Sequence, residues 1–307
     1  MNCTILLHST TGNTRLVARF ARGHLERRGH RCAIHDVGRR REVPSLDATD
    51  LLCVASPTMY FRPTYAMERA IARLPVAANG PKPAFLLATN AGDTGAHLTM
   101  LAEQLVHKDY VVLGGHVVTS TSNWPPRRAV VRRAAFAEPI ADLVASNIPG
   151  ARRYLTLLYP DLKGVSPLAP SRLEAFLDDM VDRAKRGMAS REWTAPPPGA
   201  LPQGTKPTVV AGRMMQVHMM RKATDIAIDA DRCSRCGTCV MLCPVECLTR
   251  TGDDDVPTVG TGCTGCWACF NGCPDKAISG FGAPSGAGQY RGPSGRDRSL
   301  LTVPRDG

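Results

Sequence analysis

Residues 1–145 alternate between short apolar runs and longer stretches whose apolar residues recur at helical spacing. The apolar runs predict β-strands over residues 3–8, 32–36, 51–55, 84–88 and 110–113, the last of which continues through residues 117–119. Helical spacing predicts α-helices over residues 13–28, 64–74, 95–107 and 127–146. Because strand and helix alternate, the pattern predicts an α/β fold: a doubly wound parallel sheet with helices on both faces.

Residues 147–208 are less regular and contain one clear helical pattern. Ser171 and Glu174 stand at the spacing of a capping box, and Gly187 is placed to end the helix. One apolar stripe connects the two ends and consists of Leu173, Phe176, Leu177, Met180, Val181 and Ala184. The Pro-rich residues 195–207 then predict a stiff surface linker.

The remainder of the chain divides by composition. Residues 209–223 have a helical pattern with four methionines, Met214, Met215, Met219 and Met220, for which core filling is favoured over a docking surface. Residues 224–280 hold two cysteine arrays, and residues 281–307 are rich in Gly, Pro and Ser, which predicts a disordered tail. We therefore expect four segments, at residues 1–146, 147–208, 209–280 and 281–307.

The two cysteine arrays share the spacing C-x2-C-x2-C-x3-C-P and stand thirty residues apart. Thiolates suit the iron of sulfide clusters, and in a reducing cytosol such arrays bind metal rather than form disulfides. Zinc also uses paired C-x2-C units, but it does not require three evenly spaced cysteines followed by C-P, twice. The arrays therefore predict two [4Fe-4S] clusters, held by Cys233, Cys236, Cys239, Cys243, Cys263, Cys266, Cys269 and Cys273.

In this spacing the fourth cysteine ligates the cluster of the other array. Cluster one is then expected on Cys233, Cys236, Cys239 and Cys273, and cluster two on Cys263, Cys266, Cys269 and Cys243. Residues 225–280 resemble bacterial-type two-cluster ferredoxins in this pattern, which implies a small α+β domain. The other cysteines, Cys3, Cys32, Cys53 and Cys247, are interpreted as packing residues.

The first predicted strand leads into HSTTGNTR, residues 8–15, and then into a helix. Hydroxyl groups, a tight turn at Gly12 and a helix N-terminus can bind a phosphate, although the same residues can serve only as a helix cap. The stretch is neither a P-loop nor a dinucleotide fingerprint. It resembles the phosphate loop of flavodoxins, and this resemblance implies a flavodoxin-like domain that binds FMN.

Flavodoxins place the flavin ring between two later loops at strand ends, which correspond here to residues 56–61 and 89–95. Met59 and Tyr60 are expected to cover a ring face, and Asn90 and Gly92 to meet the ring edge. The cofactor-binding set that the resemblance implies is Ser9, Thr10, Thr11, Gly12, Asn13, Thr14, Ser56, Pro57, Thr58, Met59, Tyr60, Thr89, Asn90, Ala91 and Gly92.

A later loop, residues 120–128, is a weaker signal. Asn123 and Trp124 either line a pocket over the flavin or pack in the core, and packing is favoured for Trp124. Arginines concentrate near this loop and near the second strand, where they can bind an acidic partner, but the default interpretation is a solvated face. They are Arg127, Arg128, Arg132, Arg133, Arg39, Arg40 and Arg41.

The formal net charge is +11. Two oxidised clusters and one FMN would reduce it to about +5. A basic protein suggests an acidic redox partner such as a ferredoxin, or an anionic substrate, although general solubility explains the charge equally well. The sequence shows no apolar run of membrane-spanning length, no signal peptide and no nucleic-acid motif, so we expect a cytoplasmic protein.

The chain as a whole resembles flavodoxin–ferredoxin fusion proteins of bacteria and archaea. That resemblance implies electron transfer between low-potential one-electron carriers, two [4Fe-4S] clusters and FMN. In one interpretation the protein is an oxidoreductase whose FMN reduces a small substrate in a pocket closed by Tyr60, Trp124 and Arg62. In the other it is an electron carrier or adaptor without a substrate of its own.

Overall fold

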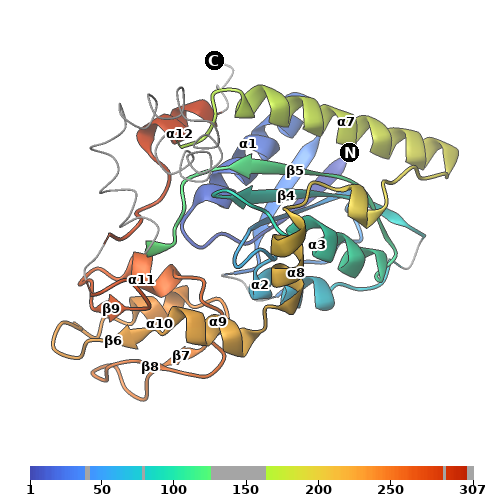
Figure 1. Ribbon diagram of the computed structural model, residues 1–307. Helices are drawn as coiled ribbons and strands as arrows, with labels where there is room; N and C mark the ends of the chain where they lie inside the picture. Colours follow the sequence, from blue (N-terminus) through green and yellow to red (C-terminus); the bar gives the residue numbers. More distant parts are fainter. Residues whose placement is uncertain (39–41, 78–79, 126–163, 286–287, 303–307) are drawn as a thin grey trace.

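The computed structural model describes residues 1–38, 42–77, 80–125, 164–285 and 288–302 of the 307-residue chain. Figure 1 shows a layered body, in which a central sheet lies between helices, and a smaller lobe formed by the cysteine arrays, drawn in orange. The chain enters the layered body first and reaches the lobe only after residue 224.

The central sheet has five parallel strands in the order β2-β1-β3-β4-β5. This is the strand order of flavodoxin-like doubly wound folds. The predicted strands are confirmed, with ends shifted by a few residues: β1 (Asn2–Leu7), β2 (Arg31–Asp36), β3 (Leu51–Pro57), β4 (Lys82–Asn90) and β5 (Tyr110–Thr119). β5 is continuous, and its register against β4 shifts between Ala84 and Phe85.

Helices cover both faces of the sheet, as the alternating pattern predicts. α1 (Asn13–Arg27) and α7 (Ala169–Ser190) pack on one face, and α2 (Tyr65–Ala72) and α3 (His97–Val106) lie on the other. Neighbouring residues of β1 point to opposite faces, so Ile5 belongs to the first apolar core and Leu6 to the second. The helix predicted over residues 127–146 lies outside the described residues.

The structure of α7 differs from the sequence analysis in three details. Its predicted stripe does bury against the sheet, so this helix belongs to the flavodoxin-like layers and not to a linker region. The capping box is absent, because the helix begins at Ala169 and the Ser171 hydroxyl donates to the carbonyl of Leu168. Gly187 does not end the helix; the lack of a side chain there leaves room for the ring of Trp193.

Residues 195–224 form a partly buried connection between the layers and the lobe. A short 3-10 turn, η2 (Pro198–Ala200), leads to Leu201, which is buried in the core beneath α3. The predicted helix over residues 209–223 is two helices, α8 (Lys206–Met214) and α9 (Val217–Thr224). Of the four methionines only Met220 is buried, so core filling is wrong for Met214 and Met219, which are exposed.

The lobe is built from two copies of one backbone unit. α10 (Thr238–Leu242) and α11 (Ala268–Gly272) are thirty residues apart, and each ends directly before the fourth cysteine of its array. β6 (Ala227–Ile228) pairs with β9 (Ile278–Ser279), and β7 (Leu248–Thr249) pairs with β8 (Thr258–Val259). Positive φ angles recur at the same spacing, at Arg235 and Gly265, Gly237 and Trp267, and Glu246 and Lys276.

The prediction of a disordered tail is wrong for residues 288–302. The Gln289 side chain donates to the carbonyls of Phe270 and Cys273, both at 2.8 Å, and the Tyr290 hydroxyl donates to Asn13 Oδ1 at 2.6 Å. α12 (Gly295–Leu300) follows, capped by Ser294. Composition does not reveal this order, because polar contacts to two other parts of the chain hold the segment in place. No helix in the described ranges is long and apolar enough to span a membrane.

Candidate functional site

The carboxyl ends of the parallel strands surround a hollow. Four loops supply its walls: those after β1 and β3, the end of β4, and the loop after β5. The lining residues are Ser9, Thr10, Thr11, Asn13, Thr14, Pro57, Thr58, Met59, Thr89, Asn90, Ala91, Ser120, Thr121, Ser122 and Asn123. Open α/β sheets bind their ligands at this end, so the hollow is the candidate cofactor site.

The structure thus brings together most of the residues predicted to bind a flavin. Four of them do not line the hollow: Gly12, Ser56, Tyr60 and Gly92. Ser56 is fully buried behind the wall. Tyr60 and Phe61 adopt positive φ angles of 51° and 63° in a tight turn between Met59 and Arg62. This turn leaves Met59 at the hollow, whereas the Tyr60 hydroxyl lies 2.6 Å from Thr224 Oγ1 in the connection to the lobe.

The loop after β1 ends at the N-terminus of α1. Gly12 is the N-cap residue with a φ of 105°, a conformation that L side chains rarely adopt. A Cβ at this position would also lie 3.2 Å from Pro293 Cδ. Ser9 Oγ accepts from the backbone N–H groups of Gly12 and Arg15, at 3.1 and 3.3 Å, which fixes the loop around the helix end. Hydroxyls and a helix N-terminus therefore face the hollow, as an anionic phosphate requires.

Asn90 supplies an unpaired acceptor in the wall. Its side chain is 8% exposed, and its Oδ1 is buried without a hydrogen-bond partner in the structure. A buried acceptor without a donor costs about 1–3 kcal/mol, so a bound molecule with N–H or O–H groups at this edge would be stabilised. Asn90 Nδ2 donates to the Gly92 carbonyl at 3.4 Å, which holds the side chain in position.

A buried histidine orients the hydroxyl of Thr58. His97 Nδ1 lies 2.7 Å from Thr58 Oγ1, and His97 Nε2 lies 2.9 Å from Ser56 Oγ. Burial lowers the pKa of His97 to about 3, so the ring is neutral at physiological pH. A neutral ring donates through one nitrogen and accepts through the other, which fixes the Thr58 hydroxyl at the wall of the hollow.

The eight array cysteines fall into two spatial sets. Burial raises the pKa of Cys239, and the neighbouring thiols of Cys273 and Cys233 raise it further. Burial also raises the pKa of Cys269, to which the thiols of Cys266, Cys263 and Cys243 contribute in the same direction. Cys273 therefore lies near Cys233 and Cys239, and Cys243 lies near Cys263, Cys266 and Cys269; the crosswise ligands stay a prediction.

The second set lines an apolar hollow. Cys243, Cys263, Cys266 and Cys269 line it together with Ile226, Val245, Cys247, Leu248, Val259, Thr264 and Trp267. The described residues contain no group of three or more His, Cys, Asp or Glu arranged to hold a single metal ion. In a [4Fe-4S] cluster each thiolate binds a different iron, so the sulfurs surround a volume and do not converge on one point.

Backbone N–H groups point at the fourth sulfur of each array. The Cys247 N–H donates to Cys243 Sγ at 3.3 Å, and the Ala277 N–H donates to Cys273 Sγ at 3.4 Å. Such hydrogen bonds stabilise thiolates that ligate iron. The side chains at these two equivalent positions differ: Ala277 is buried, whereas Cys247 Sγ lies 3.5 Å from Cys243 Sγ.

One part of the hollow wall goes beyond the predicted cofactor set. Ser120, Thr121, Ser122 and Asn123 follow β5 and close the site from the side of the lobe. Asn123 lines the hollow, as one of the two interpretations of this loop expected. Trp124 does not line the hollow, and it does not pack in the core because it is 43% exposed. The arginines at positions 39–41, 127, 128, 132 and 133 lie outside the described residues.

Comparison with known proteins supports the assignment of the lobe. A family model described as a 4Fe-4S binding domain matches residues 226–249. A ferredoxin of Methanothermococcus thermolithotrophicus is 38% identical over 56 residues, which are 18% of this chain and 93% of that ferredoxin. The pyruvate synthase subunit PorD of Methanothermobacter marburgensis is 35% identical over 51 residues, or 17% of this chain and 58% of that subunit.

Solved structures similar to the layered body include a flavodoxin from the domain Archaea, with 19% identity, a TM-score of 0.32, and coverage of 40% of this chain and 87% of the flavodoxin. An NAD(P)H:quinone oxidoreductase from Methanothermobacter marburgensis has 12% identity and a TM-score of 0.34. The match covers 52% of this chain and 92% of the oxidoreductase. The strand order itself defines the fold. The chain belongs to the ferredoxin family through its C-terminal domain and, with the flavodoxin-like sheet that precedes it, is a flavodoxin–ferredoxin fusion protein.

Proposed function

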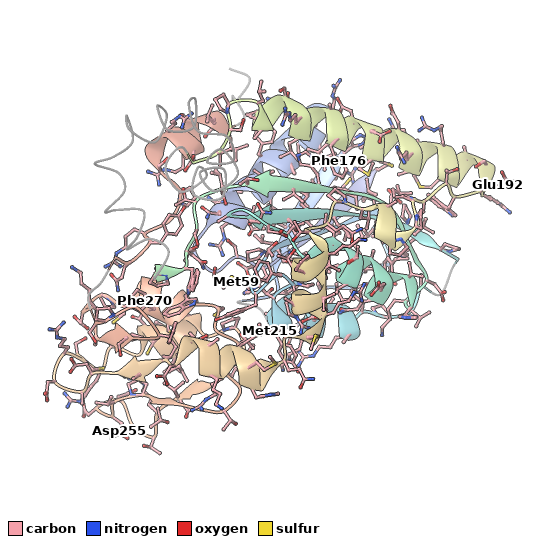
Figure 2. All side chains as sticks on the ribbon, viewed as in Figure 1. Met59, Phe176, Glu192, Met215, Asp255 and Phe270 are labelled. Carbon is pink, nitrogen blue, oxygen red and sulfur yellow. The ribbon has the colours of Figure 1, made fainter. Side chains whose placement is uncertain are left out.

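We propose that this protein is an iron–sulfur flavoprotein that moves electrons between low-potential one-electron carriers, two [4Fe-4S] clusters and FMN. The observation that carries the proposal is the position of Met59. This side chain lines the hollow at the strand ends and also packs against the apolar core that contains the array cysteines. Figure 2 shows Met59 between the sheet and the lobe. A flavin in the hollow and clusters in the lobe would therefore be neighbours.

The residues of the hollow fit FMN. Hydroxyls of the Ser9–Thr14 loop and the N-terminus of α1 would hold the phosphate, and the unpaired Oδ1 of Asn90 would accept from the ring edge. Met59 supplies an apolar surface for a ring face, and His97 keeps the Thr58 hydroxyl directed at the wall. When bound, FMN supplies the exchange between one-electron and two-electron chemistry.

The cysteines fit two clusters held crosswise. Eight thiols in two sets, with a backbone N–H on the fourth sulfur of each array, match the ligand pattern of two-cluster ferredoxins. Clusters of this kind pass single electrons, and the chain would connect such carriers to the flavin within one molecule. The protein's final electron acceptor is then either a small substrate or a partner protein.

A second function is favoured by the residues around the hollow. The substrate pocket expected of an enzyme was to be closed by Tyr60, Arg62 and Trp124. Tyr60 instead contacts Thr224, and Arg62 is engaged by both carboxylate oxygens of Glu68 at 2.8 Å. Trp124 is exposed. This arrangement supports an electron carrier or adaptor that passes electrons to another protein and has no substrate of its own.

Two glycines at opposite ends of α1 provide a matched test of the flavin site. Gly12 has a φ of 105° and stands between Thr11 and Asn13, which line the hollow, whereas Gly29 has a φ of 79° and no atom within 4 Å of an added Cβ. We expect Gly12→Ala to weaken FMN binding at least tenfold in equilibrium dialysis of the cluster-loaded chain, and Gly29→Ala to leave it within twofold. Equal FMN affinity in the two variants, or no FMN binding by the unmodified chain, would contradict the proposed site.

A further inference from the structure

The loop after β5 joins the candidate flavin site to one particular cysteine. Asn123 Nδ2 donates to Thr10 Oγ1 at 2.9 Å, within the candidate phosphate loop, and lies 3.4 Å from the carbonyl oxygen of Cys266. Asn271 Nδ2 in turn donates to the Asn123 carbonyl at 3.0 Å. A single side chain therefore spans the distance from the phosphate loop to the backbone of a cysteine in the second set.

The turn after β3 makes a second connection to the same place. Met59 packs against the core of the lobe, which includes Trp267, the residue directly after Cys266. Trp267 is 1% exposed, and the Tyr60 hydroxyl lies beside Gly265, so close that a Cβ on that residue would clash with it. Two independent loops of the flavodoxin-like domain thus meet residues 265 and 266.

The equivalent positions of the first array face the opposite way. The internal repeat pairs Cys266 with Cys236, and Cys236 is exposed. It also pairs the buried Asn271 with Met241, which is 74% exposed. The two halves share one backbone, so this difference reflects what each half contacts and not how it is folded. Cys266 and Asn271 meet the flavodoxin-like domain, whereas the equivalent Cys236 and Met241 face solvent.

We propose that cluster two, on Cys243, Cys263, Cys266 and Cys269, is the cluster that exchanges electrons with the flavin, and that cluster one is the terminal at which a one-electron carrier protein delivers or collects them. The inference rests on the proposed function, in which both clusters and FMN are present. Each transfer oxidises the carrier and reduces cluster one by one electron, which then passes to cluster two. Two such passages, with protons taken from solvent, reduce one flavin; in the reverse direction the carrier is reduced.

The internal repeat offers a pair of matched variants for the test. Cys233→Ala with Cys236→Ala removes two ligands of cluster one, and Cys263→Ala with Cys266→Ala removes the two equivalent ligands of cluster two. The probe is the phosphorus nucleus of bound FMN, observed by 31P NMR in the fully reduced, anaerobic protein. Reduced clusters are paramagnetic, and the broadening of a nuclear signal by a paramagnet falls steeply with distance.

We expect the 31P line of the unmodified protein to narrow severalfold when cluster two is removed and to change little when cluster one is removed. Narrowing caused only by the loss of cluster one, or equal narrowing in both variants, would overturn the proposed order. If a double variant does not fold, a single variant is used in its place. Cys273→Ala removes one ligand of cluster one, and Cys243→Ala removes one ligand of cluster two. Flavin and iron contents of the unmodified protein test the proposed function separately. If the unmodified protein lacks FMN or a second cluster, the proposed function itself is refuted.

Discussion

Two buried histidines predict that the folded protein loses stability in mild acid. His97 is 0% exposed and His8 is 2% exposed. Burial lowers the pKa of His97 to about 3. Burial is also the main reason that the pKa of His8 falls to about 4, with Asp36 raising it and Arg15 lowering it. Both rings are therefore neutral in the folded protein at pH values where an unfolded chain begins to bind protons.

The sign and size follow from proton linkage. The unfolded histidine titrates near its ordinary pKa of 6.5. Stability from a lowered pKa is fully present above that value and is lost as the pH falls toward the folded pKa. Between pH 7 and pH 5 each ring accounts for a loss of about 2 kcal/mol, and the two together for about 4 kcal/mol. Burial also lowers the pKa values of His30 and His116, which adds to the loss in the same direction.

The assay compares urea unfolding, followed by circular dichroism under anaerobic conditions, at pH 7 and pH 5. We expect the loss of unfolding free energy between the two pH values to be about 2 kcal/mol smaller in His97→Gln and in His8→Gln than in the unmodified chain. His218 is exposed on α9, so His218→Gln is the control for replacement of a histidine at the surface. Any acid damage to the clusters is common to all variants and cancels in the comparison.

The measured quantity is the change with pH and not the stability at one pH. His97→Gln also removes hydrogen bonds to Ser56 and Thr58, which lowers the unfolding free energy at both pH values alike. If the variants show the same loss between pH 7 and pH 5 as the unmodified chain, the histidines are not held neutral by burial and the reasoning fails.

Three further predictions concern the lobe and its support. Cys243→Ser and Cys273→Ser should each damage the cluster of the opposite array. Iron counts and resonance spectra measure the damage. Damage to the cluster of the same array would refute the assignment of the fourth cysteine to the other cluster. Cys247→Ala should lower the reduction potential of cluster two and not of cluster one, because it removes an S–H group 3.5 Å from Cys243 Sγ; an unchanged potential in a spectroscopic redox titration contradicts this. Glu68→Gln should destabilise the fold by about 3 kcal/mol, because Arg62 and Glu68 are largely buried. The exposed pair of Arg213 and Glu103 is its control, and Glu103→Gln should cost less than about 1 kcal/mol in the same urea unfolding; equal losses would refute the contrast.

The sequence was most informative where one periodicity governs a whole element. β3 and β4 are apolar runs that are buried along nearly their whole length, so both could be located from the chain alone. The array spacing likewise predicted the internal repeat, because a cluster imposes the same backbone on each set of ligands. The loops around the hollow could be located because parallel strands present their carboxyl ends at one edge.

Sequence patterns failed where distant parts of the chain decide a local conformation. Tyr60 was expected at the flavin, but two positive φ angles turn it toward Thr224, which lies on a helix far along the chain. Residues 288–302 resemble a disordered tail in composition, yet Tyr290 is held by Asn13 and Gln289 by the loop of Cys273. Such contacts involve polar side chains with no periodic signature.

The net charge of the chain also conceals a local difference. The whole chain carries a formal charge of +11, which suggested an acidic partner. Residues 225–280 contain eight acidic and four basic side chains, so the lobe is acidic even before clusters are added. The lobe therefore carries a net negative charge, and the positive charge lies on the rest of the chain.

The most direct test of the account is a stepwise anaerobic reduction of the purified chain, with iron and flavin quantified first. The account predicts about eight iron atoms and one FMN per chain, with the flavin absorbance bleached by electrons that enter through the clusters. Flavin absent from a chain that holds its iron, or flavin that stays oxidised while both clusters are reduced, would contradict the claim that this fusion connects the two kinds of cofactor.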